Sequence, residues 1–108
     1  MPTEIFQTEN MIDLTPFSRL IAVFSITAVS SDNWRGIGVG TSHLAAGENN
    51  GTVLYQNPYC CNVAIQKTSG VNSNAHEVIL DVSSISGNYY VSIVTGQQTG
   101  LCSQVRLE

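Results

Sequence analysis

The sequence predicts an all-β protein, built as a sandwich or a barrel of about eight short strands. Apolar residues alternate with period two, most clearly at Leu20, Ala22 and Phe24, which is the pattern of a strand with one buried face. Clusters of Gly, Asn, Ser and Thr separate such segments at intervals of about 8 to 12 residues, as in sandwiches and barrels. No segment carries the apolar stripe and the caps of a long helix.

Short runs of β-branched and aromatic residues mark the individual strands. The first strand is expected near residues 4–7 and the second over 20–28, and the others over 37–39, 52–55, 62–66, 78–82, 89–94 and 104–107. Asn50-Gly51 is the sharpest turn signal, because type I′ turns require positive φ at both central residues. Residues 36–40 alternate glycine with β-branched residues, which indicates a strand that another backbone or side chain approaches closely.

Two segments share the order Asp, aliphatic, hydroxyl, any residue, bulky apolar, Ser. They are residues 13–18, the first corner, and residues 81–86, the second corner. We interpret both as bends in which Asp and hydroxyl side chains bond free backbone N–H groups, while Phe17 or Ile85 fills the core below. Gly87 supplies conformational freedom where the chain reverses. Two such corners suit a two-sheet antiparallel β-sandwich whose strands cross from one sheet to the other.

The composition of the chain argues against some classes of partner. The 108 residues are 43% hydrophobic and carry a formal net charge of −4, and this length suffices for one core, so we expect a single domain over residues 1–108. The longest apolar run, residues 20–24, is too short to span a membrane, and residues 1–4 lack the pattern of a secretory signal peptide. Scattered basic residues cannot neutralise a phosphate backbone, which argues against nucleic acid as a partner; they are Arg19, Arg35, Lys67 and Arg106.

Residues 12–20 and 79–91, which carry the two corners and the strands that follow, resemble small jelly-roll domains of phage and prophage tail or fibre proteins. Similar domains recur in secreted bacterial proteins and look like carbohydrate-binding modules. The resemblance implies a jelly-roll sandwich of about eight strands, without catalytic residues or cofactors. It also implies glycan recognition or a place in a larger particle, a virion assembled in the bacterial cytoplasm. Because the chain reaches its first corner early, either its first strand is brief or a neighbouring subunit supplies an edge strand.

A glycan site needs a flat aromatic face for sugar C–H groups, with amide, carboxyl or guanidinium groups for the hydroxyls. Trp34 is the first candidate, because it lies in a polar stretch between Asn33 and Arg35 that we expect to be a loop. Tyr55 is the second and Tyr90 the third, since neighbouring strand residues face opposite ways and Tyr90 is expected to face outward. The alternative for each aromatic residue is packing in or beside the core. The predicted ligand-binding residues are therefore Asn33, Trp34, Arg35, Tyr55 and Tyr90.

The three cysteines, Cys60, Cys61 and Cys102, leave an odd count. Because neighbouring strand residues face opposite ways, Cys60 and Cys61 cannot both bridge Cys102. One bridge to Cys102 and no bridge both stay open, and buried reduced thiols suit assembly in a cytoplasm. Acidic and amide residues in 32–33 and 48–50 could offer oxygen ligands to Ca²⁺, but their spacing is that of solvated turns. We expect no metal site.

The sequence contains no Gly-x-Ser-x-Gly, His-Glu-x-x-His or phosphate-binding glycine loop. A triad could be drawn from a serine, a histidine and Asp81, or a pair from Cys102 and His76, but no surrounding pattern supports either set. We therefore expect a protein that is not an enzyme, and a small enzyme is the weakest of three hypotheses.

Two other functions remain. The first is a non-catalytic phage or prophage virion module, of a tail or fibre, that binds cell-surface carbohydrate. The second is a purely structural virion protein, a fibre or capsid decoration, that assembles with itself or with other virion proteins. Ile21 and Val23 lie opposite Ala22 and Phe24 on one strand, and apolar residues on both faces predict covering by another chain, as a homotrimer.

Overall fold

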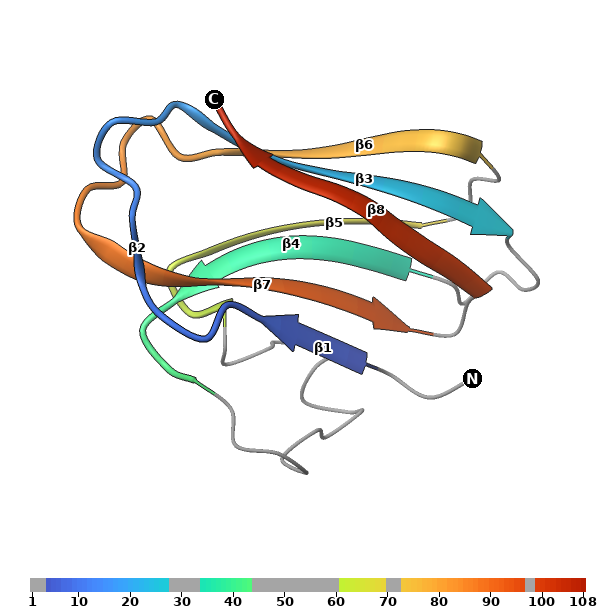
Figure 1. Ribbon diagram of the computed structural model, residues 1–108, viewed down its shortest axis with the longest axis horizontal. Helices are drawn as coiled ribbons and strands as arrows, with labels where there is room; N and C mark the ends of the chain where they lie inside the picture. The colour runs from blue at the N-terminus through green and yellow to red at the C-terminus, as the bar shows by residue number, and fades with distance from the viewer. Residues whose placement is uncertain (1–3, 28–33, 44–60, 70–72, 97–98) are drawn as a thin grey trace.

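The computed structural model describes residues 4–27, 34–43, 61–69, 73–96 and 99–108. These residues form no helix and eight strands: β1 (Glu4–Gln7), β2 (Ile12–Asp13), β3 (Arg19–Thr27), β4 (Trp34–Gly40), β5 (Ala64–Ser69), β6 (Ser73–Asp81), β7 (Asn88–Gly96) and β8 (Thr99–Leu107). The large sheet has the order β1-β7-β4-β5, with β2 paired to β7, and the small sheet has the order β6-β3-β8. The two antiparallel sheets pack face to face (Figure 1). The predicted all-β sandwich is confirmed, and its jelly-roll connectivity stays a prediction.

Most predicted strands lie where the pattern of residues put them. β1 covers the predicted residues 4–7, and β3 is displaced by one residue from the prediction for 20–28. The predicted strand at 52–55 and the turn at Asn50-Gly51 lie outside the described residues. β5 begins two residues later than predicted, because the side chain of Asn62 instead accepts a hydrogen bond from the Thr41 backbone N–H at 2.9 Å.

Both predicted corners are confirmed, and they share two hydrogen bonds. The carboxylate of Asp13 accepts a bond from the backbone N–H two residues later at 3.0 Å, and Asp81 does the same at 2.9 Å. In each corner the backbone N–H of the bulky apolar residue donates to the carbonyl three residues earlier, at 3.0 Å. That residue, Phe17 or Ile85, packs against the core. Local side-chain turns therefore bend the chain at both places.

The two corners also bond each other. The Leu14 N–H donates to the Gly87 carbonyl at 2.9 Å, and the Gly87 N–H donates to the Thr15 hydroxyl at 2.9 Å. Gly87 has a φ of 102°, which is in the region that favours glycine. The first corner leads from β2 in the large sheet to β3 in the small one, and the second leads from β6 back to β7. Together they close one end of the sandwich (Figure 1).

The core lies between the sheets and is built from alternate strand residues, as period two requires. Its buried members are at most 7% exposed: Leu14, Leu20, Ala22, Phe24, Ile37, Val39, Val78, Leu80, Val82 and Val91.

The two faces of β4 differ in how closely their neighbours approach. The β-branched residues of 36–40 join the core, while a Cβ added at Gly38 would lie 2.5 Å from the sulfur of Cys61, and one at Gly36 would lie 2.7 Å from the Gln66 carbonyl oxygen. The close approach predicted for this strand is confirmed.

The outer face of the small sheet carries an apolar residue that the chain itself covers. Ile21 points away from the core by alternation but is only 1% exposed. Its neighbours across the sheet are Ile79 and Arg106. The Arg106 guanidinium on β8 bonds Glu77 on β6 at 2.9 Å, so its side chain crosses the outer face of β3, the strand between them. Ile21 is therefore buried within the chain itself, whereas Ile79 is 41% exposed, and covering by another chain stays a prediction.

Candidate functional site

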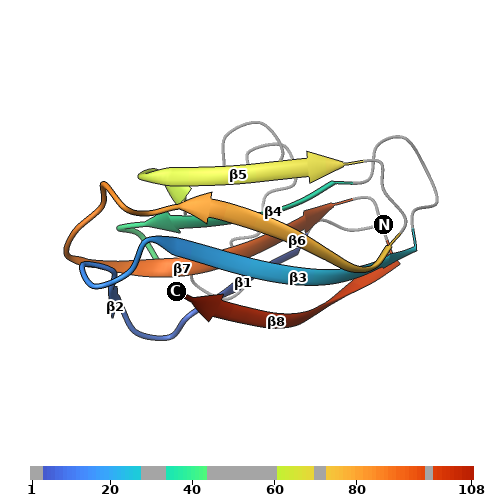
Figure 2. The ribbon, with the colours of Figure 1, turned by 90° about the horizontal axis from the view of Figure 1, so that it is seen from above.

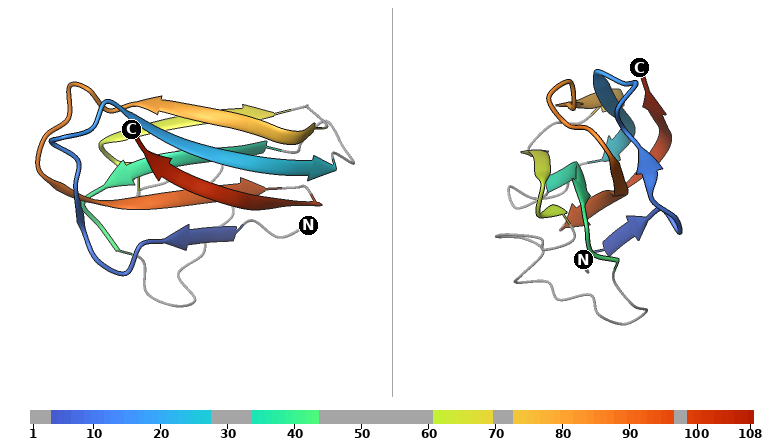
Figure 3. Two further views of the ribbon diagram at one scale, coloured as in Figure 1. Left: turned by 45° about the horizontal axis from the view of Figure 1, so that its top comes forward. Right: turned by 90° about the vertical axis from the view of Figure 1, so that its left-hand side faces the viewer.

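The sandwich has two long sides along which edge strands of the two sheets face each other (Figures 2 and 3). β5 lies beside β6 on one side, and β1 and β8 lie on the other. The first side holds an open cavity of about 250 Å³, which we name the β5/β6 cavity. Its lining residues are Gln66, Thr68, His76, Glu77, Val78 and Ile79.

Arg35 on β4 is fully buried. It is not one of the residues that line the cavity, but it contacts His76, which is. Arg35 lies on the core face of β4, and its register partner in β5 is Thr68. The Nη2 atom of its guanidinium lies 2.6 Å from Nδ1 of His76, which is on β6 in the opposite sheet. A guanidinium only donates hydrogen bonds, so Nδ1 accepts and the neutral imidazole carries its proton on Nε2. This bond joins the two sheets beside the cavity.

The remaining donors of Arg35 are not satisfied by the described residues. Its Nε and Nη1 atoms are buried and find no hydrogen-bond partner within that part of the chain. By contrast, Arg19 and Arg106 lie at the surface and bond carboxylates. An arginine cannot shed its proton, and an uncompensated buried ion costs about several kcal/mol. Arg35 is thus a buried cation in need of a hydrogen-bond acceptor.

The electrostatics of the pair follow from its position. Burial lowers the pKa of the Arg35 guanidinium from its ordinary value, yet an arginine stays charged at neutral pH. Burial first, and the positive charge of Arg35 second, lower the pKa of His76. A neutral imidazole is the form that can accept the bond from Arg35. The site therefore presents one positive charge beside a neutral ring, an amide and a hydroxyl.

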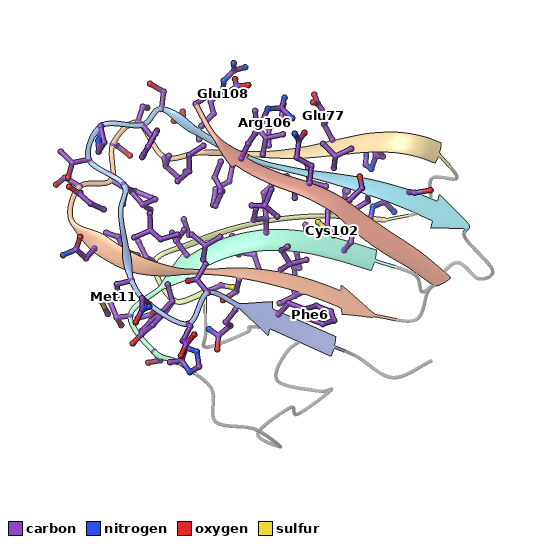
Figure 4. The ribbon with its side chains drawn as sticks, in the orientation of Figure 1. Phe6, Met11, Glu77, Cys102, Arg106 and Glu108 are labelled. Atoms are coloured by element: carbon purple, nitrogen blue, oxygen red, sulfur yellow. The ribbon has the colours of Figure 1, made fainter. Side chains whose placement is uncertain are left out.

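One negative charge lies at the mouth of the cavity. Glu77 lines it, but alternation along β6 directs this side chain to the outer face, where it bonds Arg106 at 2.9 Å. Figure 4 shows the two side chains together outside the small sheet. The carboxylate is therefore already partnered and does not neutralise Arg35.

The structure moves two predicted binding residues out of the expected loop. Trp34 is the first residue of β4, and Arg35 is the second. Backbone pairing explains the correction, because β5 and β7 flank this end of β4 and continue their ladders to Trp34. Asn33 and Tyr55 lie outside the described residues.

Tyr90 lies far from Arg35. It pairs with Gly40 at the other end of β4, which places it roughly 17 Å along the strand. Its ring meets the ring of His43 edge on, with centroids 5.0 Å apart, whereas its neighbour Tyr89 packs against the core. Arg35 and Tyr90 therefore do not share a site, and the binding roles assigned from sequence stay predictions.

Sequence reasoning did not assign three residues of the cavity to a binding site: Gln66, Thr68 and His76, the last of which was considered instead as a partner of Cys102. The available signal was a polar residue at an inward position of a strand. His76 stands two residues before Val78 and four before Leu80, both of which are buried, so period two places it on the core face. Nothing in the sequence indicated that Arg35 would meet it.

The other reactive side chains form no comparable site. Cys102 carries a free thiol beside the core, and burial raises its pKa, so the less nucleophilic protonated form is favoured. Cys60 lies outside the described residues. Across the described ranges, no three His, Cys, Asp or Glu side chains gather as metal ligands. No helix in those ranges is long and apolar enough to cross a membrane.

The chain was compared with models of known protein families, with curated proteins and with solved structures, and none of them matches it significantly. The fold and the β5/β6 cavity are therefore the basis of the functional argument.

Proposed function

We propose that this protein is a non-catalytic binding module whose ligand enters the β5/β6 cavity. One observation carries the proposal: Arg35 is fully buried beside the cavity, and two of its nitrogen atoms have no partner among the described residues. Buried polar groups in folded proteins are nearly always hydrogen-bonded, and exceptions gather where function needs them. A ligand that supplies acceptors there would compensate the buried charge.

Cell-surface carbohydrate is the ligand class we propose. The cavity is lined by Gln66, Thr68 and His76. The amide of Gln66 and the hydroxyl of Thr68 can both donate to and accept from sugar hydroxyls, and the Nε2–H of His76 can donate to them. The backbone of Trp34 pairs with Ser69, next to Thr68, so an aromatic residue belongs to the same end of the sheet. The resemblance to phage tail and fibre domains supports a virion setting, reached from the bacterial cytoplasm.

A glycan array tests this proposal. We expect the wild-type protein to bind a subset of glycans, and the double variant Gln66→Ala, Thr68→Ala to bind them at least about tenfold more weakly. The control is Asn10→Ala, which removes an exposed amide on the other side of the sandwich. Glycan binding that the double variant retains in full would contradict the proposal, as would an array on which nothing binds.

Self-assembly is the second candidate function, and the β1/β8 side favours it. Phe6 is 60% exposed and Val105 is 41% exposed, and each lies on a strand at the end of its sheet. On the same side, between β8 and the segment that follows β1, lies a cavity of about 230 Å³, which we name the β1/β8 cavity, with Ile12, Leu20, Val91 and Leu107 in its lining. Edge strands beside exposed apolar groups are sites for pairing with another copy.

Light scattering after size exclusion tests self-assembly. The expected result is a homo-oligomer, with the trimer as the predicted state. A monomer at every concentration up to the solubility limit would exclude this candidate.

A further inference from the structure

We infer that the ligand of the β5/β6 cavity carries a carboxylate, as in an acidic sugar, and that this group binds Arg35. The inference rests on the proposed function, because it names the chemical class recognised at the same site. Three lines of observation lead to it: the donors left on Arg35, the net charge of the site and the contact of Arg35 with His76, which lines the cavity.

The donors come first. One N–H on Nε and two on Nη1 are unpartnered within the described part of the chain. Charge-assisted bonds between arginine and a carboxylate are roughly twice as strong as neutral ones, and they offset the burial of both ions. A sugar hydroxyl could accept one of these bonds but would leave the charge uncompensated.

The net charge selects a monoanion. Arg35 contributes one positive charge, the His76 ring is neutral when it accepts the bond from Arg35, and Glu77 at the mouth is negative but bonded to Arg106. A carboxylate carries one negative charge and therefore neutralises the single positive charge of Arg35. A doubly charged phosphate would bring an excess negative charge to a site that holds one positive charge, and Glu77 lines the same cavity.

His76 connects Arg35 to the cavity. Arg35 is fully buried, whereas His76 is half-buried and lines the cavity. Rotation of the imidazole away from Nη2 opens the guanidinium to the cavity, and side-chain rotamer changes of this kind are common on binding. The incoming carboxylate then accepts hydrogen bonds from Nη2 together with the unpartnered Nε or Nη1. The volume of about 250 Å³ admits one small group rather than an extended chain.

The test compares sugars that differ in one group. Glucuronate and glucose, and galacturonate and galactose, are titrated into the protein while the backbone amide resonances of β5 and β6 are followed by NMR. We expect each acid to bind about tenfold to a hundredfold more tightly than its neutral counterpart, since a hydrogen bond to a charged group contributes that much. Acetate and inorganic phosphate are titrated as the simplest carboxylate and the competing dianion.

Three variants locate the effect. Arg35→Gln keeps a donor without the charge, and it should reduce the affinity for glucuronate to that for glucose. Arg19→Gln, which removes an exposed cation bonded to Glu108, should leave both affinities unchanged. Glu77→Gln removes the negative charge at the mouth and should strengthen glucuronate binding by about twofold to fivefold. Because Glu77 is a surface residue, this last variant keeps the test decisive even if the Arg35 variant fails to fold.

The outcomes separate the two proposals. Equal binding of glucuronate and glucose, with shifts confined to β5 and β6, would overturn the carboxylate inference and leave the proposed function standing. Tighter binding of phosphate than of acetate would also overturn the inference. If no probe shifts the amide resonances of β5 and β6, both the carboxylate inference and the proposed function are excluded.

Discussion

The two long sides of the sandwich contain cavities of nearly the same size, about 250 and 230 Å³, but their linings differ in chemistry. On the β5/β6 side the inward residues include Thr68 and His76, with Arg35 buried behind them. On the β1/β8 side they include Leu20 and Leu107. In both places the edge strands of two twisted sheets diverge and leave space. The backbone thus supplies the space, and a few inward side chains decide whether it suits a polar ligand or an apolar surface.

The largest predicted effect lies on the apolar side. Leu20→Ala removes a fully buried side chain that borders the β1/β8 cavity. We expect the free energy of unfolding to fall by about 2–5 kcal/mol. The deletion enlarges an existing cavity, and the hydrogen-bonded corners limit how far the surrounding structure can relax to fill it. Chemical denaturation measures it. A loss below about 0.5 kcal/mol would mean that this side is not part of the packed core.

On the polar β5/β6 side, a substitution is expected to raise the free energy of unfolding instead. Arg35→Met replaces an incompletely partnered buried cation by an apolar side chain of similar length, and we expect the ligand-free protein to become more stable by about 1–4 kcal/mol. The reference is Arg19→Met, at the surface, for which we expect a change within about 1 kcal/mol. Destabilisation by Arg35→Met would assign Arg35 a structural rather than a ligand-binding purpose.

A pH titration of stability sharpens the contrast, since the polar cavity is lined by His76, whose ordinary pKa lies in the mildly acidic range, and the described lining of the apolar cavity contains no histidine. The pKa of His76 is lowered below 6.5 in the folded protein, so between that lowered value and 6.5 the unfolded chain binds more protons than the folded one. The contribution of His76 is therefore complete above pH 6.5 and is lost as the pH falls through the folded pKa. The groups facing the ring are the Arg35 cation, the neutral Gln66 and Thr68, and Phe24 on β3.

His76→Asn separates this effect from the titration of carboxylates, because an asparagine places an acceptor near the position of Nδ1 but does not titrate. Its free energy of unfolding should vary less than that of the wild type between neutral and mildly acidic pH. Identical slopes in the two proteins would contradict the assignment. Asp13 and Asp81 do not interfere, since hydrogen bonds from the hydroxyl and the backbone of Thr15 or Ser83 lower their pKa values below 3.8.

The smallest effect on stability is expected for the exposed apolar residues. The double variant Phe6→Ser, Val105→Ser should change the free energy of unfolding by no more than about 1 kcal/mol, because both side chains are largely solvated. If the β1/β8 side mediates self-assembly, the same variant should lower the mass measured by light scattering. An unchanged oligomer would place the interface elsewhere.

The accuracy of the sequence-based predictions follows from the range of the interactions. The corners depend on hydrogen bonds between residues two or three apart, as between Asp13 and Thr15. Their residue pattern was therefore sufficient to predict them from the sequence. The close approach to β4 was predictable from its glycines, although the partner Cys61 was not. The loop assigned to Trp34 and Arg35 from the polarity of their neighbours was wrong, because pairing with strands far along the chain makes both residues part of β4.

The sequence by itself determined that this protein is a two-sheet β structure with two bonded corners and a core of alternating apolar residues, because those features arise from local backbone chemistry and from period two. Only the tertiary structure decided that Arg35 would be buried and that His76, 41 residues away, would be its partner. Their meeting depends on how two sheets stack, and the cost of burying a charge depends on every group around it. The chemistry of the candidate site therefore belongs to the packed sandwich rather than to any segment of the chain.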